Sequence, residues 1–173
     1  SGHVRVYQRN GTSWNQMGAD IDGEAAEDNS GWSVSLSSDG SRVAIGALYN
    51  DGNGSNSGHV RVYQWNGTSW NKMGADIDGE AADDWSGYSV SLSSDGSRVA
   101  IGAPRNDGNG QSAGHVRVYQ WDGTLWTQMG TDIDGEAQYD SLGHSVSLSS
   151  DGSILAIGAP YTNNTGHVKV YQW

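Results

Sequence analysis

Residues 88–103 read Tyr-Ser-Val-Ser-Leu-Ser-Ser-Asp-Gly-Ser-Arg-Val-Ala-Ile-Gly-Ala, with an Asp-Gly pair between two mainly apolar and small-residue runs. Alternation with a period of two predicts a β-strand. Asp-Gly between two such runs predicts a hairpin, because both residues tolerate positive φ angles. Further strand-like runs follow at residues 115–121 and 125–130, with Asp122-Gly123 turning the chain between them. The stretch is therefore predicted to form four antiparallel strands and no helix.

The pattern of this stretch recurs along the chain. A Gly-His-Val sequence begins at Gly2, Gly58, Gly114 and Gly166. The first two units are identical at 46 of 56 positions, and the third is four residues shorter in a polar segment at 162–165. A loss of length confined to one polar segment indicates a surface loop. We therefore treat residues 1–173 as one repeat array with units at 2–57, 58–113 and 114–165 and a partial unit at 166–173.

A repeated unit of four antiparallel strands is typical of β-propeller blades. Side-chain size supports this fold, because the first two runs carry small residues such as Ser35 and Ala44, whereas the last two carry Tyr63 and Trp70. Blades converge at a central axis, so their inner strands need small residues, whereas the parallel layers of a β-solenoid do not. The prediction is an all-β fold of propeller blades with four antiparallel strands, about three blade-equivalents in this chain. The expected core residues are Val34, Leu36, Val43 and Ile45 with their equivalents Val90, Leu92, Val99, Ile101, Val146, Leu148 and Ile157.

Composition restricts the classes of partner. The chain has 173 residues and a formal net charge of −11, so it offers no basic surface for nucleic acid or for an anionic membrane. Apolar residues make up 35%, and no run approaches the ~20 residues that span a bilayer. There are no cysteines, which excludes disulfides, thiol nucleophiles and thiolate metal sites. We expect neither a nucleic-acid partner nor membrane insertion.

Three elements of the middle unit are similar to a known repeat. They are Ser-Gly-Tyr-Ser-Val at 86–90, Val-Ala-Ile-Gly-Ala-Pro at 99–104 and Gly-His-Val-Arg-Val-Tyr at 114–119. Together they resemble the FG-GAP repeat, the blade of integrin α-subunit propellers and related extracellular proteins, and the resemblance covers essentially the whole chain. It implies a propeller fold, adhesion or ligand binding at one propeller face, and calcium in the loop of the inner hairpin.

The calcium loop of that family is not matched here. The inner hairpin turns through Ser38-Asp39-Gly40-Ser41, which holds one carboxylate. Calcium takes 6–8 oxygen ligands, and a tight turn with one carboxylate does not supply them. Asp39 and its equivalents Asp95 and Asp151 are therefore interpreted as turn formers.

A second acidic segment links each unit to the next. Asp20-Ile21-Asp22-Gly23-Glu24 places carboxylates at alternate positions, similar to the start of an EF-hand loop but without its terminal Glu. One interpretation is a calcium or other hard-cation site, and the other is a solvated crossing whose Asp and Gly residues shape turns. The candidate metal ligands are Asp20, Asp22, Glu24, Asp76, Asp78, Glu80, Asp132, Asp134 and Glu136.

Histidines and serines recur once per unit. His3, His59, His115 and His167 occupy one repeat position, and we expect them to tie a strand to a loop by hydrogen bonds. Residues that repeat in this way occupy equivalent places on separate blades and do not assemble one site with different catalytic roles. No nucleophile-elbow motif is present either. We therefore expect no enzymatic activity and no cofactor other than calcium.

The predicted function is non-catalytic adhesion or ligand binding by an extracellular or cell-surface propeller, with a protein or glycan partner. Two alternatives stay open: a structural building block of a surface coat or filament, and a lectin-like propeller that stacks Trp or Tyr on sugars. Only two complete blades are predicted, at 32–73 and 88–129, whereas closed propellers have about 4–8. We therefore expect self-association or further blades of a longer chain.

Overall fold

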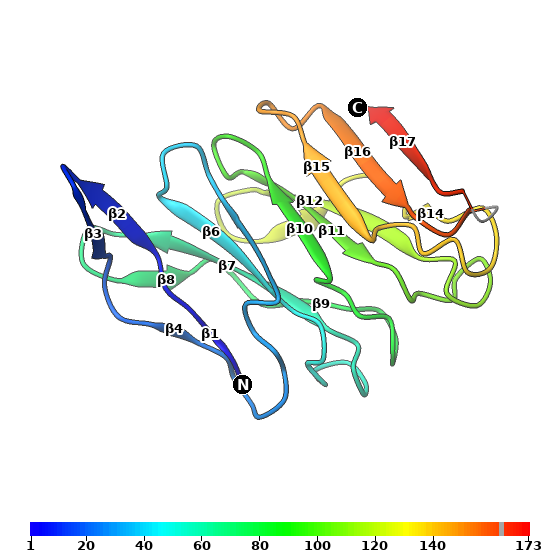
Figure 1. The fold of residues 1–173 in the computed structure, drawn as a ribbon, viewed down its shortest axis with the longest axis horizontal. Coiled ribbons are helices and arrows are strands. Elements are labelled where there is room, and N and C mark those ends of the chain that lie inside the picture. Colours follow the sequence, from blue (N-terminus) through cyan, green and yellow to red (C-terminus); the bar gives the residue numbers. More distant parts are fainter. Residues whose placement is uncertain (163–164) are drawn as a thin grey trace.

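The computed structural model describes residues 1–162 and 165–173 as a row of antiparallel sheets, which Figure 1 shows side by side from the N-terminal to the C-terminal end. The first blade pairs its strands in the order β5-β6-β7-β8, and the second in the order β10-β11-β12-β13. The first blade comprises β5 (Ser33–Leu36), β6 (Arg42–Ala47), β7 (His59–Trp65), β8 (Trp70–Lys72) and β9 (Ile77–Asp78). The second comprises β10 (Ser89–Leu92), β11 (Arg98–Ala103), β12 (His115–Trp121), β13 (Trp126–Gln128) and β14 (Ile133–Asp134).

Incomplete sheets flank these two blades. The third blade contains β15 (Ser145–Leu148), β16 (Ile154–Ala159) and β17 (His167–Gln172). The N-terminal unit, residues 1–22, contains β1 (His3–Val4), β2 (Tyr7–Asn10), β3 (Ser13–Gln16) and β4 (Ile21–Asp22). It forms two small sheets, β1-β4 and β2-β3. The all-β fold of blade-like repeats predicted from the sequence is confirmed.

Neighbouring blades are joined through their innermost strands, because β10 packs between β5 and β15. Ser33 Oγ donates a hydrogen bond to the Gly87 carbonyl oxygen at 2.7 Å, and Ser35 Oγ accepts one from the Leu92 amide at 2.9 Å. The second and third blades repeat both contacts, through the hydroxyls of Ser89 and Ser91. The serines of the alternating pattern thus face the following blade.

Glycine is required on the strand beside this contact. A Cβ added at Gly46 would collide with the carbonyl oxygen of Gly87, and one at Gly102 would collide with that of Gly143. The small residues inferred for the inner strands therefore permit the close approach of blade to blade.

The hydrophobic core lies between the sheets, in three clusters. Val43, Ile45, Val99 and Ile101 are buried as expected. Val34 and Leu36 are instead 54% and 51% exposed, so their predicted burial is wrong. In the second blade the equivalent residue Leu92 packs against the preceding blade. Among the described residues no inner strand precedes β5, so Val34 and Leu36 have no such blade to pack against.

Tryptophans join the outer strands across blade boundaries. Trp70 Nε1 donates to the Met17 carbonyl oxygen at 2.8 Å, and Trp126 Nε1 donates to that of Met73 at 2.9 Å. A second indole, Trp65, lies against Gly18 of the preceding unit. Bulky outer residues therefore bond and pack the blades together at their wide side.

The acidic links between blades contain a short strand that the sequence did not indicate. Ile77–Asp78 (β9) pairs with the start of β7, and Ile133–Asp134 (β14) pairs in the same way with β12. Ile77 is buried in the core between the first and second blades. Among the described residues no helix has the length and hydropathy needed to span a membrane.

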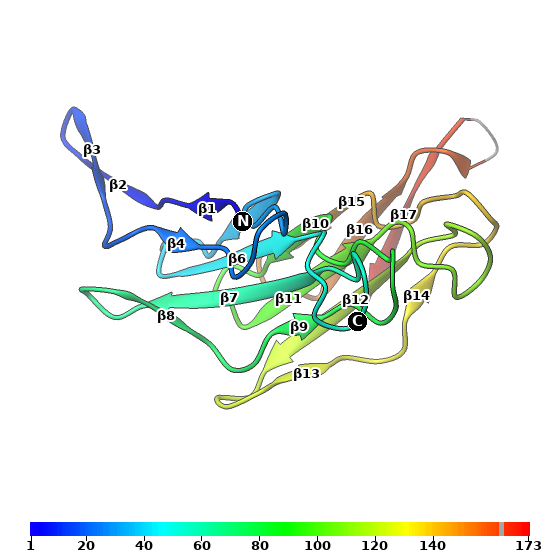
Figure 2. The same ribbon diagram turned by 90° about the horizontal axis from the view of Figure 1, so that it is seen from below.

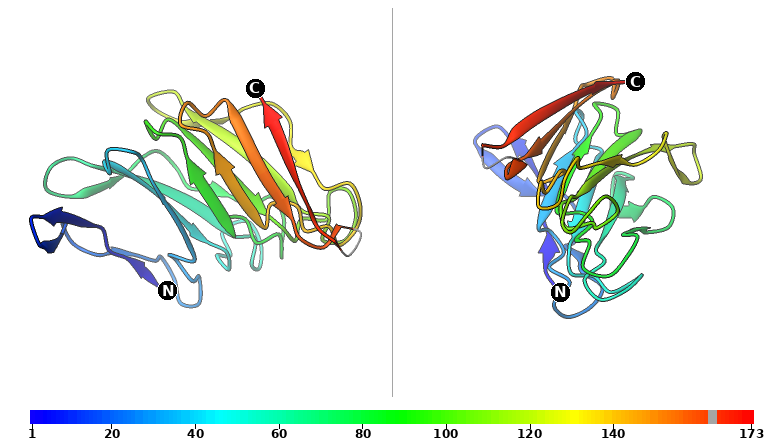
Figure 3. Two further views of the ribbon diagram at one scale, coloured as in Figure 1. Left: turned by 45° about the horizontal axis from the view of Figure 1, so that its top comes forward. Right: turned by 90° about the vertical axis from the view of Figure 1, so that its right-hand side faces the viewer.

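The two edges of the row differ. Tight Asp-Gly turns form the upper edge in Figure 1, and long connections form the lower edge, which Figure 2 views directly. We call this lower edge the loop face. It consists of the linkers at 23–32, 79–88 and 135–144 and of the loops at 48–58, 104–114 and the described part of 160–166. Figure 3 shows the blades standing beside one another, so that these connections from successive units lie together.

Candidate functional site

The three carboxylates proposed as one cation site in the first linker are not brought together. Asp20 forms an ion pair with Arg5 at 2.8 Å within the N-terminal unit. Glu24 crosses instead to the first blade, where it pairs with Arg61, and Arg61 also pairs with Asp76 at 2.9 Å.

The same crossing recurs at each blade boundary. Glu80 lies 2.9 Å from Arg117 of the second blade, which also pairs with Asp132 at 2.6 Å. Glu136 pairs with Lys169 of the third blade at 2.7 Å. Each linker glutamate thus joins a cation on the third strand of the next blade. The aspartates Asp22, Asp78 and Asp134 are exposed.

The arginines favour the charged form of the two aspartates, Asp76 and Asp132. Burial opposes ionisation of Asp76, but hydrogen bonds from Arg61 and Lys72 outweigh it and lower the pKa of that carboxyl to about 2. The hydrogen bond from Arg117 lowers the pKa of Asp132. Burial lowers the pKa of His59 and of His115, which lie beside the two groups.

Two mixed clusters result, and their composition differs from the predicted one. Glu24, His59 and Asp76 have ligand atoms within 4.8 Å of one another, as do Glu80, His115 and Asp132. The Nδ1 atom of His115 is buried and makes no hydrogen bond within the described part of the chain, in contrast to the strand-to-loop bond expected from the sequence. In each cluster an arginine already contacts both carboxylates, so a metal ion would compete with a guanidinium. The metal assignment stays a prediction.

The aspartates of the inner hairpins shape their turns. Asp39 accepts hydrogen bonds from Ser37 Oγ at 2.7 Å and from the Ser41 amide at 2.9 Å. The bond from the Ser41 backbone is the main cause that lowers the pKa of Asp39 to about 2. Asp95 and Asp151 accept the equivalent bonds in the other blades.

Differences between the first two units gather on the loop face. The first two units differ at ten positions, and eight of these lie in the linkers or long loops. The exceptions are Arg9/Trp65 and Gln16/Lys72 on the outer strands. The eight pairs are Glu27/Asp83, Asn29/Trp85, Trp32/Tyr88, Leu48/Pro104, Tyr49/Arg105, Ser55/Gln111, Asn56/Ser112 and Ser57/Ala113. This signal is present in the sequence, but without the fold the eight positions are not seen to share a face.

In the first two units a shared polar scaffold supports the variable residues. Asp28 is buried and its Oδ2 accepts hydrogen bonds from Asn50 Nδ2 at 3.1 Å and from the Ala25 amide at 3.0 Å. Asp84 and Asn106 repeat this bond at 2.9 Å in the next unit. The linkers at 23–32 and 79–88 are thereby fixed to their long loops by the same pair, while the residues above it change. The third unit keeps the aspartate as Asp140 but has Thr162 in place of the asparagine.

Trp85 is the most unusual of these residues. Its φ angle is +59°, a region that bulky residues rarely adopt, and its equivalents Asn29 and Ser141 hold the same conformation with small side chains. The ring of Tyr49 meets Trp85 edge-on at 5.4 Å, and the guanidinium carbon of Arg105 lies 3.6 Å from the Trp85 ring centroid. All non-glycine residues with positive φ in the described part of the chain lie on the loop face, namely Glu27, Asn29, Asn56, Asp83, Trp85, Ser112, Tyr139 and Ser141.

A row of rings crosses the three blades beside this cluster. Trp32 and Tyr88 lie 5.7 Å apart between ring centroids, and Tyr88 and His144 lie 4.9 Å apart. The Tyr88 hydroxyl is also 3.2 Å from His144 Nε2. These three residues occupy one repeat position at the start of the innermost strands.

A groove of about 490 Å³ opens between the first and second units on the loop face. Trp85 and Tyr49 supply aromatic surface, and Arg105 supplies a cation. Glu27, Asp51 and Asp83 line it with carboxylates. A groove that combines rings with hydrogen-bonding groups of both charges can hold and orient a polar ligand. Among the described residues that line it, no nucleophile is paired with a base.

Comparisons with known proteins bear on the fold and the family. A structure described as a "putative 6-phosphogluconolactonase from Bacteroides uniformis" aligns with a TM-score of 0.66 at 10% identity, over 98% of this chain and 44% of that one. A "putative TolB from Agrobacterium tumefaciens" aligns with a TM-score of 0.54 at 13% identity, over 97% of this chain and 51% of that one. The chain thus spans about half the length of these two structures, and at such identities the likeness shows the fold alone.

Sequence comparison gave a family but no individual relative. No curated protein matches the chain. A family model described as the FG-GAP repeat matches residues 20–63 and 75–119, more than half of the chain and most of two repeat units. The chain belongs to the FG-GAP repeat family.

Proposed function

We propose that this chain is part of a non-catalytic, ligand-binding β-propeller that acts outside the cell or at its surface, and that the loop face binds the ligand. The observation that carries the proposal is the concentration on that face of the differences between the first two units. Units that are otherwise nearly identical keep the Asp28–Asn50 scaffold and change the residues above it. Function placed on loops over a rigid scaffold explains such a distribution.

The strained conformation of Trp85 supports the same face. A tryptophan at positive φ costs about 1–3 kcal/mol, whereas the first unit has Asn29 there, a residue type that tolerates that region. A favourable contact between the indole and a ligand would offset this strain. Membership of the FG-GAP family supports an extracellular adhesion role, and the net charge of −11 favours a partner with a basic or neutral contact surface.

Glycan binding is the second candidate function. The row formed by Trp32, Tyr88 and His144 places ring centroids 5.7 and 4.9 Å apart across three blades. Trp32 is half exposed, so its ring offers an apolar surface on which a sugar can stack. Retention on immobilised oligosaccharides, abolished by Trp32→Ala and Tyr88→Ala together, would favour this candidate over a protein ligand.

The proposal is tested by exchanging residues between units. Asp83→Glu, Trp85→Asn and Arg105→Tyr give the second unit three residues that the first unit already carries, so the fold tolerates them. Wild type and this triple variant are compared for binding to an oligosaccharide array and to a panel of immobilised matrix glycoproteins. We expect the triple variant to lose at least about tenfold in affinity for whatever wild type binds.

Lys72→Gln is the matched control. It is also an exchange between units, but it lies on β8 away from the loop face. The control is expected to bind as wild type does. Equal binding by all three proteins would move the ligand site away from the loop face.

A further inference from the structure

A buried imidazole lies where the linker at 79–88 meets the second blade. The side chain of His115, at the start of β12, is only 4% exposed. Its Nδ1 atom makes no hydrogen bond within the described part of the chain. Buried polar atoms of folded proteins are nearly always paired. This nitrogen therefore indicates a partner other than the described groups of the chain.

Two carboxylates face this nitrogen. Glu80 Oε2, from the linker, lies 4.0 Å from His115 Nδ1, and Asp132 Oδ2, just before β14, lies 3.9 Å from it. Both distances are too long for a hydrogen bond. The ligand atoms of a tetrahedral zinc site are about 3.4 Å apart, because Zn–N and Zn–O bonds measure about 2.0–2.2 Å. A shift of about 0.5 Å would bring each oxygen to that separation from the nitrogen.

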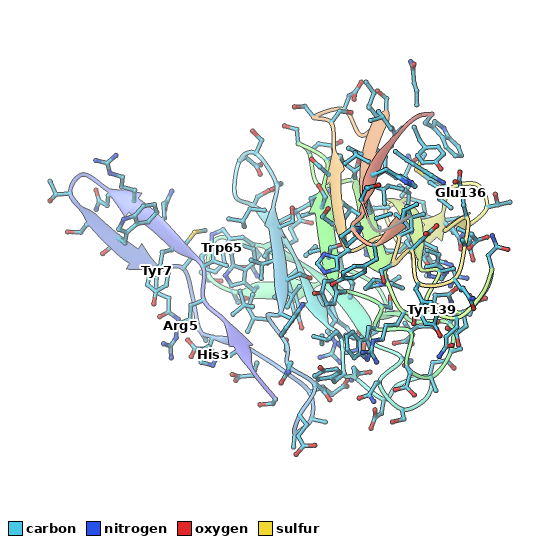
Figure 4. All side chains as sticks on the ribbon, turned by 45° about the vertical axis from the view of Figure 1, so that its right-hand side comes forward. His3, Arg5, Tyr7, Trp65, Glu136 and Tyr139 are labelled. Carbon is cyan, nitrogen blue, oxygen red and sulfur yellow. The ribbon has the colours of Figure 1, made fainter. Side chains whose placement is uncertain are left out.

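The cluster already holds a cation. Arg117 Nη2 lies 2.9 Å from Glu80 Oε2 and 2.6 Å from Asp132 Oδ2, the same two oxygens that face His115. Residues two apart on a strand share a face, and Figure 4 shows the equivalent pair, His3 and Arg5, on one side of the chain in the N-terminal unit. The guanidinium pairs with both carboxylates but leaves the imidazole nitrogen without a partner. A metal ion in its place would bind all three atoms.

We propose that Glu80, His115 and Asp132 bind a divalent transition-metal ion such as Zn²⁺, which displaces the guanidinium of Arg117. The three ligand atoms lie within 4.8 Å of one another. Imidazole nitrogen is a good ligand for zinc, copper, iron and nickel, whereas calcium takes six to eight oxygens. Zinc is also bound by three protein ligands with water in the fourth position.

The ion fastens a linker of the loop face to the second blade. Glu80 stands near the start of the linker that carries Trp85, whereas His115 belongs to the second blade. Metal binding therefore holds this linker in place whatever ligand the loop face takes. The site goes beyond the proposed function and does not depend on it.

Calorimetric titration with zinc chloride, and with calcium chloride for comparison, tests the site. Glu80→Gln removes one ligand from a side chain that is 52% exposed, so the fold should tolerate the change. We expect Glu80→Gln and His115→Gln each to bind one zinc ion fewer than wild type. Arg117→Gln should bind zinc about tenfold or more tightly than wild type, because the competing positive charge is gone.

Asp134→Asn is the matched control. It removes an exposed carboxylate of the same acidic segment that is not one of the three ligands, so it should bind zinc as wild type does. Zinc should also raise the urea midpoint of wild type and of Asp134→Asn but not that of Glu80→Gln, because an ion bound by the folded chain alone stabilises it.

Three results would overturn the proposal. The first is an unchanged number of bound zinc ions in both Glu80→Gln and His115→Gln. The second is no zinc binding by either wild type or Arg117→Gln. The third is tighter binding of calcium than of zinc by Arg117→Gln, which would assign the cluster to a cation that prefers oxygen ligands.

Discussion

The guanidinium carbon of Arg105 lies 3.6 Å from the ring centroid of Trp85. This contact joins the long loop at 104–114 to the linker at 79–88. A cation over an indole is stabilised by the ring quadrupole, and more so where water is partly excluded. In the described part of the chain Arg105 takes part in no ion pair, although Glu27, Asp51 and Asp83 line the same groove. The stacked guanidinium therefore keeps N–H groups for a ligand.

Trp85→Asn is expected to change the free energy of unfolding by less than about 1 kcal/mol. Asparagine tolerates positive φ, as Asn29 does at the equivalent position, so relief of backbone strain offsets the lost contacts with Arg105 and Tyr49. Urea unfolding followed by tryptophan fluorescence measures the change. A loss above about 2 kcal/mol would show that Trp85 serves stability rather than ligand binding.

Trp126→Phe is expected to destabilise the protein more than Trp121→Phe, by about 1 kcal/mol. Both changes remove an indole ring. Of these two indoles as the structure describes them, only that of Trp126 donates a hydrogen bond across the blade boundary, to the Met73 carbonyl oxygen at 2.9 Å. An acceptor left without its donor at a partly buried site costs about 1–3 kcal/mol. Equal midpoints in urea would contradict the role given to this bond.

The core and the site were predictable from the sequence to different degrees. Strand positions followed from alternation and from Asp-Gly turns, and the strand β12 has the predicted bounds. The prediction that Val34 is buried was wrong, because its burial depends on a blade that packs on β5 and not on the residue itself. The link between Glu24 and Arg61 could not be predicted either, since residues far apart in sequence meet only when blade follows blade.

The free energy of unfolding is expected to decrease as the pH is lowered, in two separate pH ranges. Burial lowers the pKa of His59 and His115 below the ordinary value of about 6.5. The unfolded chain then binds more protons than the folded one, so this contribution is complete above about pH 6.5 and is lost as the pH falls below it. Asp76, with a folded pKa of about 2, adds stability that is present above about pH 4 and is lost between about pH 4 and 2.

Urea midpoints measured from pH 8 to 2.5 test both windows. His115→Asn should flatten the profile between about pH 6.5 and 5, and Asp76→Asn should flatten it below about pH 4. A wild-type profile that is level between pH 7 and 5 would show that the buried imidazoles do not resist protonation.

Calcium, where it binds, is expected to compete with arginine. A cation held by Glu24 and Asp76 has to displace Arg61, so Arg61→Gln should bind calcium more tightly than wild type in calorimetric titration. Asp76→Ala with Asp78→Ala should remove that binding. Unchanged calcium affinity in the double variant would place any bound ion elsewhere, and no heat with wild type and with Arg61→Gln would favour the solvated crossing.

If the loop face binds the ligand, amide hydrogen exchange of the complex will show where the contact lies. The partner that the binding survey identifies is added in excess, and exchange is compared with that of the free chain. We expect new protection at residues 79–88 and 104–114, with the upper Asp-Gly turns unchanged. Protection confined to the outer strands β8 and β13, or to the turns at Asp39 and Asp95, would contradict it.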